Sequence, residues 1–159
     1  MASERKRLLM QELLVRLRTD LERMERAQQR TVDGAISDEA KPENSKDTRA
    51  LEQTYLARGQ AQRVAELREG LARVAAMPNQ AFPQDARVAV GALVTIDEAD
   101  GESVLLIVPF GGGIRLRDGE QAVTPASPLG RALIGKAVGD DCEIAIAGRR
   151  RAISIRAIE

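Results

Sequence analysis

Two long stretches of the sequence, 4–30 and 47–76, repeat apolar or small side chains at alternating spacings of three and four residues. The first contains neither glycine nor proline, and its repeating positions are Met10, Leu14, Leu17, Leu21, Met24 and Gln28. The repeating positions of the second are Ala50, Thr54, Ala57, Ala61, Val64, Leu67, Leu71 and Val74. This spacing is the heptad pattern of a coiled coil. We therefore predict two long helices that pack along a narrow seam.

The segment between these stretches predicts a reversal of the chain. It reads TVDGAISDEAKPENSK (31–46) and contains residues that end helices and form turns, namely Gly34, Pro42, Asn44 and Ser45. Helices joined by a local loop pack antiparallel, and a helix of about 27 residues is roughly 40 Å long. We expect residues 1–77 to form a projecting antiparallel coiled-coil hairpin with its tip at 31–47.

A proline-containing linker, MPNQAFPQD (77–85), precedes a change in the sequence pattern. We place a second domain after it, at 78–159. Its first segment, 92–110, has the composition of two strands and contains Asp100-Gly101, a hairpin turn signal. The second domain is therefore expected to begin with a β-hairpin.

The rest of this domain predicts more strands and one short helix. The segment IRLR (114–117) is typical of a short strand. The segment 143–159 is typical of two strands joined by a turn around Gly148. Between them, SPLGRALIGK carries the signals of a short helix. These are Ser127 as the cap, Pro128 at the first position and Gly135 after the last turn. The fold class predicted for the whole chain is α+β.

Composition excludes several catalytic chemistries. The chain contains no histidine, which excludes a Ser-His-Asp triad, a Cys-His pair and a histidine-ligated metal. Cys142 is the only cysteine, so no internal disulfide is expected. Lys and Arg together number 24, and Asp and Glu together also number 24. The chain therefore has no excess of basic residues of the kind that is typical of a nucleic-acid-binding protein. The charged N-terminus and short apolar runs predict a cytoplasmic protein without signal peptide or membrane span.

The segment VTPASPLGRALIGKAVGDDCEIAIAGRRRAISIRAIE (123–159) resembles the C-terminal signature of the Gre-type transcript cleavage factors of bacterial RNA polymerase. The common features are Ser-Pro, an Arg-Ala-Leu helix, Gly-Lys, Gly-Asp and two closing strands. The order of helical hairpin, polar tip and small β-rich domain is similar to that family as well. The resemblance implies an FKBP-like C-terminal domain that docks on the polymerase. It also implies a set of polymerase-binding residues: Ser127, Pro128, Leu129 and Gly130.

The resemblance further implies a mode of action. The C-terminal domain would bind the rim of the polymerase secondary channel, and the hairpin would enter the channel. Carboxylates at the tip would help to hold Mg²⁺ at the polymerase active centre, where two-metal chemistry cleaves backtracked RNA. The protein would be an accessory elongation factor rather than an enzyme. Its partner would be bacterial RNA polymerase, with indirect contact to backtracked RNA, association with DNA in the complex, and a monomeric free state.

The tip departs from the pattern of that family at one position. Glu43-Asn44 matches a Glu-Asn pair at the family's tip, but Ala40 occupies the place of an Asp, and Asp47 that of an aromatic residue. We predict an acidic functional tip made of Asp38, Glu39, Glu43 and Asp47, with Glu43 and Asp38 as the ligands of a shared Mg²⁺. Two interpretations stay open. The tip is rebuilt and supports cleavage, or the protein is a non-cleaving regulator that competes with other channel-binding factors.

The features that suggest function can also be explained by their structural roles alone. A loop between helices is ordinarily charged, and Ser127 is an ordinary helix cap. The arginines at 149–151 fit a solvated hairpin, in which alternation points Arg150 away from its neighbours. The glycines at 111–113 lack the Lys and Ser/Thr of a phosphate loop and indicate a bend. An FKBP-like fold would suggest a prolyl isomerase, but 2% aromatic residues leave little to line a proline pocket.

Overall fold

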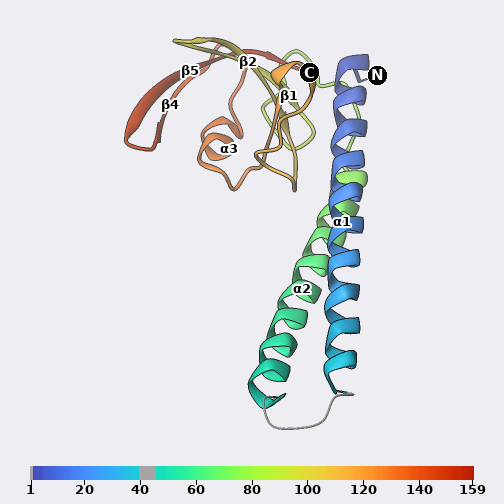
Figure 1. The fold of residues 1–159 in the computed structure, drawn as a ribbon. Coiled ribbons are helices and arrows are strands. Elements are labelled where there is room, and N and C mark those ends of the chain that lie inside the picture. Colours follow the sequence, from blue (N-terminus) through green and yellow to red (C-terminus); the bar gives the residue numbers. More distant parts are fainter. Residues whose placement is uncertain (1, 40–45) are drawn as a thin grey trace. The chain divides into compact units, whose positions relative to one another are not determined.

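Two long helices begin the chain in the computed structural model, which describes residues 2–39 and 46–159. Helix α1 spans Glu4–Glu39 and helix α2 spans Lys46–Ala75 (Figure 1). Both predicted helices are confirmed. The predicted end of the first helix near residue 30 is wrong, because α1 continues to Glu39.

Helix α1 continues through the glycine that was expected to end it. A glycine in a helix interior costs about 1 kcal/mol relative to alanine. A side chain at Gly34 would meet nothing within 4 Å, so no close contact requires this glycine. One such residue does not stop a helix, since each added residue gains a backbone hydrogen bond. Of the predicted tip, 31–39 is therefore helical, and 40–45 lie outside the described residues.

The chain forms two compact units, which we describe separately. Arg16–Leu71 make up the helical unit. Met1–Val15 and Ala72–Glu159 make up the mixed unit, which contains the first turns of α1, the end of α2 and all of the strands. The domain limits 1–77 and 78–159 stay a prediction.

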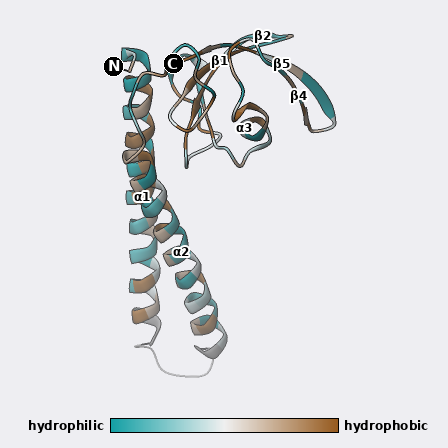
Figure 2. Cartoon of the chain, turned by 180° about the vertical axis from the view of Figure 1, so that it is seen from behind, coloured by the Kyte–Doolittle hydropathy of each residue, from teal (hydrophilic) through white to brown (hydrophobic). Residues whose placement is uncertain are grey.

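In the helical unit, α1 and α2 pack against each other through an antiparallel seam. Leu17, Val64 and Leu67 are buried in this seam. The Arg68 guanidinium donates to the Glu25 carboxylate at 2.7 Å, which joins the two helices. Figure 2 shows hydrophobic and hydrophilic stretches alternating along both helices, as expected for helices with one buried side.

The seam of α2 differs from the prediction near the start of the helix. Its half-buried positions there are Gln53, Ala57 and Gln60. Of the predicted seam positions, three are exposed: Ala50, Thr54 and Ala61. Small side chains gain little from burial, so their spacing does not determine which side of a helix turns inward.

The mixed unit contains a five-stranded sheet in the order β3-β2-β1-β5-β4. Figure 1 labels β1, β2, β4 and β5. The strands are β1 (Leu93–Glu98), β2 (Gly101–Ile107), β3 (Gln121–Val123), β4 (Asp141–Ile146) and β5 (Arg149–Ile158). Only the β2–β3 pair is parallel. The two predicted hairpins, β1–β2 and β4–β5, are confirmed.

The predicted strand at 114–117 is wrong. Arg115 makes only an isolated bridge to Gln121, and a short 3₁₀ turn, η1, follows at Arg117–Gly119. β2 pairs with β1 on one edge and with β3 on the other, and β3 was not predicted. With three residues, β3 is too short to show the alternation on which strand prediction depends.

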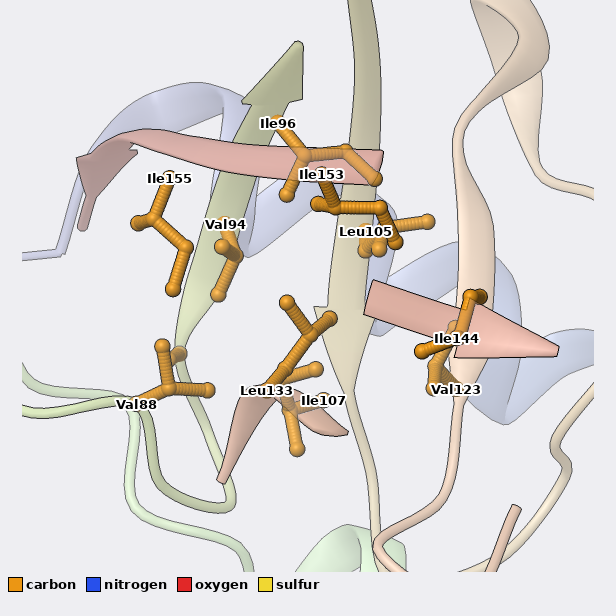
Figure 3. Close-up of a cluster of buried hydrophobic side chains, with 11 residues drawn as sticks. Val88, Val94, Ile96, Leu105, Ile107, Val123, Leu133, Ile144, Ile153 and Ile155 are labelled. Atoms are coloured by element: carbon orange, nitrogen blue, oxygen red, sulfur yellow. The ribbon is translucent and has the colours of Figure 1, made fainter. Parts of the chain in front are cut away.

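Strands and helix α3 (Pro128–Leu133) enclose the core of the mixed unit. Leu133 of α3 lies beside Ile107 of β2, beneath side chains from the central strands (Figure 3). The buried cluster consists of Val88, Ala92, Val94, Ile96, Leu105, Ile107, Val123, Leu133, Ile144, Ile153 and Ile155. All members are aliphatic, as expected for a chain with 2% aromatic residues.

Charged contacts hold the first turns of α1 on the β-rich part of the mixed unit. Arg5 donates to the Glu120 carboxylate at 2.7 Å, and the Glu120 side chain is almost fully buried. Further along α1, Glu12 accepts from the backbone N–H and the side chain of Arg117 at 3.1 and 3.2 Å. The start of α1 is therefore part of the same packed body as the sheet.

Lys6 lies fully buried between these two contacts. Its ammonium group donates to the main-chain oxygens of Gln80 and Glu159 at 2.7 and 3.1 Å and lies 4.6 Å from the centre of the Phe82 ring. Burial lowers the pKa of Lys6, and the nearby charge of Glu159 partly opposes this shift. One side chain thus joins α1, the linker and the last residue of the sequence.

Candidate partner-binding site

A cavity of about 750 Å³ lies beside the start of α3 and contains most of the predicted polymerase-binding residues. Ser127, Pro128 and Leu129 line it, whereas Gly130 does not. The other lining residues are Pro109, Phe110, Gly111, Gly112, Gly113, Gln121, Ala122, Val123, Thr124, Ala126, Ile146 and Arg151. We call this cavity the α3 groove. Its wall is mainly apolar, as in sites that take up side chains of a partner.

The cap of α3 fixes the position of the residues that line the groove. The Ser127 hydroxyl accepts from the Gly130 N–H at 3.0 Å and donates to the Thr124 carbonyl at 2.8 Å. Pro128 occupies the first turn and is exposed. Leu129 is half-buried and packs against the core. The predicted cap is confirmed, and it leaves Pro128 as the most accessible of the four residues.

Gly130 has a structural role. Its position is buried, and a Cβ built there would lie 1.9 Å from the Thr124 carbonyl oxygen and 3.0 Å from the Cα of Pro125. Both neighbours are backbone atoms, which cannot rotate away. Only glycine allows the loop 124–127 to lie directly against α3, so this residue shapes the groove from behind.

The opposite wall was not predicted. Pro109 and Phe110 follow β2 after one further residue, Val108, and both are half-buried at the groove. Gly111 and Gly113 have φ of +89° and +87°, a conformation that glycine adopts without strain. The prediction that the glycines at 111–113 form a bend is confirmed, and the bend places Phe110 in the groove. The only signal for this in the sequence was an apolar run that ends in Pro-Phe.

A second cavity, of about 500 Å³, lies at the β4–β5 hairpin. We call it the arginine cavity, and its lining residues are Glu98, Ala99, Asp100, Ile146, Arg149, Arg150, Arg151 and Ala152. Arg151 donates to Glu98 at 2.6 Å. The other oxygen of Glu98 is buried and has no partner among the described residues. Ile146 and Arg151 line both cavities, so the two hollows adjoin.

The predicted acidic tip falls largely outside the part of the chain that the structure describes. Glu43 lies in the undescribed segment 40–45, and the side chains of Asp38, Glu39 and Asp47, at the ends of α1 and α2, also lie outside the described part. Within 2–37 and 48–159, no three His, Cys, Asp or Glu side chains are grouped as metal ligands would be. Both the acidic tip and its Mg²⁺ ligands stay predictions.

Cys142 lies in β4, half-buried and packed against the core. Burial raises the pKa of its thiol; the charge of Lys136 lowers it, and the charges of Asp141 and Asp140 raise it. A thiol with a raised pKa forms little of the reactive thiolate near neutral pH. These properties favour a structural role for Cys142.

The family of the sheet-containing region follows from its sequence. Residues 83–159 match the family described as "Transcription elongation factor, GreA/GreB, C-term", a match that includes α3 and both cavities. Residues 83–159 belong to the GreA/GreB family. We call them the Gre-type domain, and the resemblance seen in 123–159 is confirmed. A search of curated proteins finds no match to the chain.

Several solved structures of Gre-related proteins are similar to this chain. GreA factor homolog 1 of Thermus thermophilus has 19% identity over 92% of this chain and 94% of its own, with a TM-score of 0.41. The homolog from Thermus aquaticus has 18% identity over 91% and 92%, with a TM-score of 0.42. A GreA/GreB elongation factor from Nitrosomonas europaea has 21% identity over 60% and 78%, with a TM-score of 0.37. Likenesses at these TM-scores carry no argument about function.

In the described parts of the chain, no helix is both long enough and apolar enough to cross a bilayer.

Proposed function

We propose that this protein is an accessory factor of bacterial RNA polymerase that binds at the secondary channel and modulates elongation by stimulating cleavage of backtracked RNA. The observation that carries the proposal is the Gre-type domain at 83–159 together with the α3 groove, where three of the four predicted polymerase-binding residues lie. The long helices α1 and α2 support it, because a hairpin of this length can present a tip far from its base.

The α3 groove is the proposed docking site. Its wall combines an exposed Pro128 with the half-buried rings of Pro109 and Phe110. Apolar and aromatic residues around a hollow are typical of the centre of an interface, where a partner side chain becomes fully desolvated. The groove therefore offers the anchoring contact that a polymerase-bound factor needs.

In this proposal the tip contributes oxygen ligands and the polymerase does the chemistry. Asp38 and Glu43 would hold a Mg²⁺ ion together with the polymerase, with Glu39 and Asp47 as further acidic residues. Mg²⁺ is commonly bound through one or two carboxylates plus phosphate and water. Two carboxylates would therefore suffice, without a complete metal site of the protein's own.

Stalled, backtracked elongation complexes with Mg²⁺ provide the test. We expect the protein to bind these complexes and to increase the rate at which their RNA is shortened. Pro128→Asp places a charge in the apolar groove at a helix position that tolerates Asp, so the variant should fold normally but bind polymerase weakly. If the wild-type protein shows no binding to polymerase, the whole proposal fails. If it binds and cleavage is unchanged, only the cleavage part fails.

A second candidate function is a channel-binding regulator that blocks other factors without supporting cleavage. Ala40, in place of the family's Asp, favours it. This regulator would slow cleavage induced by a separate, cleavage-competent factor in proportion to its concentration. Cleavage by the protein alone, at a rate above that of the polymerase, would contradict this candidate.

A further inference from the structure

The α3 groove and the arginine cavity differ sharply in chemistry although they adjoin. Ile146 and Arg151 line both. On one side of this pair the wall carries apolar residues, among them Phe110 and Pro128. On the other side the lining residues include three consecutive arginines and two carboxylates. A ligand that extends through both hollows must therefore be apolar at one end and complementary to arginine at the other.

The charge of the arginine cavity is partly compensated within the protein. Arg151 is paired with Glu98. The remaining charged residues of the wall are Arg149, Arg150 and Asp100, two positive charges and one negative. Both free arginines are exposed, and neither forms an ion pair within the described residues. The cavity therefore keeps an excess of positive charge, although residues 78–159 as a whole carry more acidic than basic residues.

Strand register separates the two free arginines. In the β4–β5 hairpin, Arg149 is opposite Ile146, and Arg150 is opposite Ala145. Because side chains alternate along a strand, Arg149 shares the side of Arg151 and of the buried Ile153, and Arg150 lies on the other side. The turn before them holds two positive φ angles, 51° at Ala147 and 75° at Gly148. Such two-residue turns fix hairpin register.

We propose that the two hollows together bind one polypeptide segment of the polymerase, with an apolar side chain in the α3 groove and an adjacent carboxylate on Arg149. This inference rests on the proposed function and adds the chemistry of the partner segment. A guanidinium group offers paired donors that fit a carboxylate. Arg149 is the docking arginine, and Arg150 contributes only to the surrounding positive potential.

A polypeptide fits these hollows better than a nucleic acid. No Phe, Tyr or Trp lines the arginine cavity, so bases would have no ring on which to stack there. Glu98 and Asp100 in its wall repel a strand that carries a charge at every nucleotide. A polypeptide can instead place one carboxylate at Arg149 and an apolar side chain beside Phe110.

The test compares Arg149→Ala with its neighbour Arg150→Ala, which removes the same charge from the other side of the strand. Binding to core RNA polymerase is measured with and without DNA and RNA, each at low and at high salt. We expect Arg149→Ala to weaken binding about three- to tenfold at low salt and to reduce its salt dependence. Arg150→Ala should have a clearly smaller effect. Thermal unfolding of each variant checks that the fold is intact.

Three outcomes would overturn the inference. Arg149→Ala could bind like the wild type, both variants could lose affinity equally, or the loss could occur only when nucleic acid is present. If any of these occurs while Pro128→Asp still weakens binding, the α3 groove docks without the arginine cavity, and the proposed function survives. If the wild-type protein does not bind polymerase, the proposed function itself fails.

Discussion

At the scale of single residues, close backbone contacts and burial explain why certain positions carry residue types that the sequence suggested were functional. Gly130 stands in the motif that resembles the family's polymerase-contacting loop, yet the structure requires glycine there because the Thr124 carbonyl occupies the place of a side chain. The Ser127 hydroxyl makes two hydrogen bonds, one to Thr124 in the loop and one from the Gly130 N–H in α3. Pro128 is left as the residue of this motif with the greatest freedom to contact a partner.

Gly130→Ala should destabilise the Gre-type domain strongly. The new methyl group would lie 1.9 Å from a backbone oxygen, so loop 124–127 or α3 must move. We expect a loss of about 3 kcal/mol in the free energy of unfolding. The matched control is Gly34→Ala, because a side chain at this helical position would meet nothing within 4 Å. This variant should gain up to about 1 kcal/mol in the free energy of unfolding. Urea unfolding measures both, and equal effects would contradict the steric explanation.

Lys6→Met should destabilise the mixed unit and change how its stability depends on pH. The two main-chain oxygens that accept from Lys6 lose their donor, at a cost of about 2–3 kcal/mol near neutral pH. Burial lowers the pKa of Lys6 below 10.5 in the folded state. Between the folded and unfolded pKa values the unfolded chain binds more protons, so wild-type stability should rise with pH there.

Urea unfolding from about pH 7 to about pH 10.5 checks the effect of Lys6. The rise with pH should be present in the wild type and missing in Lys6→Met. Parallel stability curves for the two proteins would show that the folded state does not shift the pKa of this lysine. The loss near neutral pH is a separate readout of its two hydrogen bonds.

At the scale of elements, prediction succeeded where the sequence pattern lies within the element itself and failed where several distant segments come together. Heptads predicted α1 and α2, and the cap signals at Ser127, Pro128 and Gly135 predicted α3. The α3 groove could not be predicted in the same way. Its walls come from the segment after β2, strand β3, the start of α3 with the loop before it, and the β4–β5 hairpin, which only the strand order brings together.

The polar seam of α2 provides a test at this scale. Gln60 lies in the seam, and its side-chain oxygen is buried without a partner among the described residues. Gln60→Leu removes this unpaired group and adds apolar contact with α1, so we expect a gain of about 1–2 kcal/mol in the stability of the helical unit. Gln62→Leu, at an exposed position nearby, should change stability by less than about 0.5 kcal/mol.

Urea unfolding followed by helical circular dichroism measures both glutamine variants. A loss of stability in Gln60→Leu would show that the amide oxygen has a bound water or another partner in solution. An equal gain in both variants would indicate a general preference of α2 for leucine, unrelated to the seam.

At the scale of the whole molecule, the proposed division of labour assigns recognition to the Gre-type domain and effect to the tip. The two depend on different residues. Pro128 and Arg149 would govern whether the protein binds polymerase, and the residues around Ala40 would govern whether the bound protein stimulates RNA cleavage. Binding and cleavage should therefore respond to different substitutions.

Ala40→Asp tests this division. It restores the carboxylate that the family places three residues before the Glu of Glu-Asn, and a further oxygen ligand favours Mg²⁺ at the tip. We expect cleavage of backtracked RNA to accelerate about tenfold, equivalent to about 1.4 kcal/mol of transition-state stabilisation, with polymerase binding unchanged. Ser37→Asp, which adds a carboxylate on an exposed part of α1, is the control and should leave the rate as it is. Combined with Pro128→Asp, Ala40→Asp should lose its gain at low protein concentration and regain it at saturation, because docking limits only occupancy. A gain that is equal in Ser37→Asp would mean that added negative charge alone, and not its placement at position 40, determines the effect.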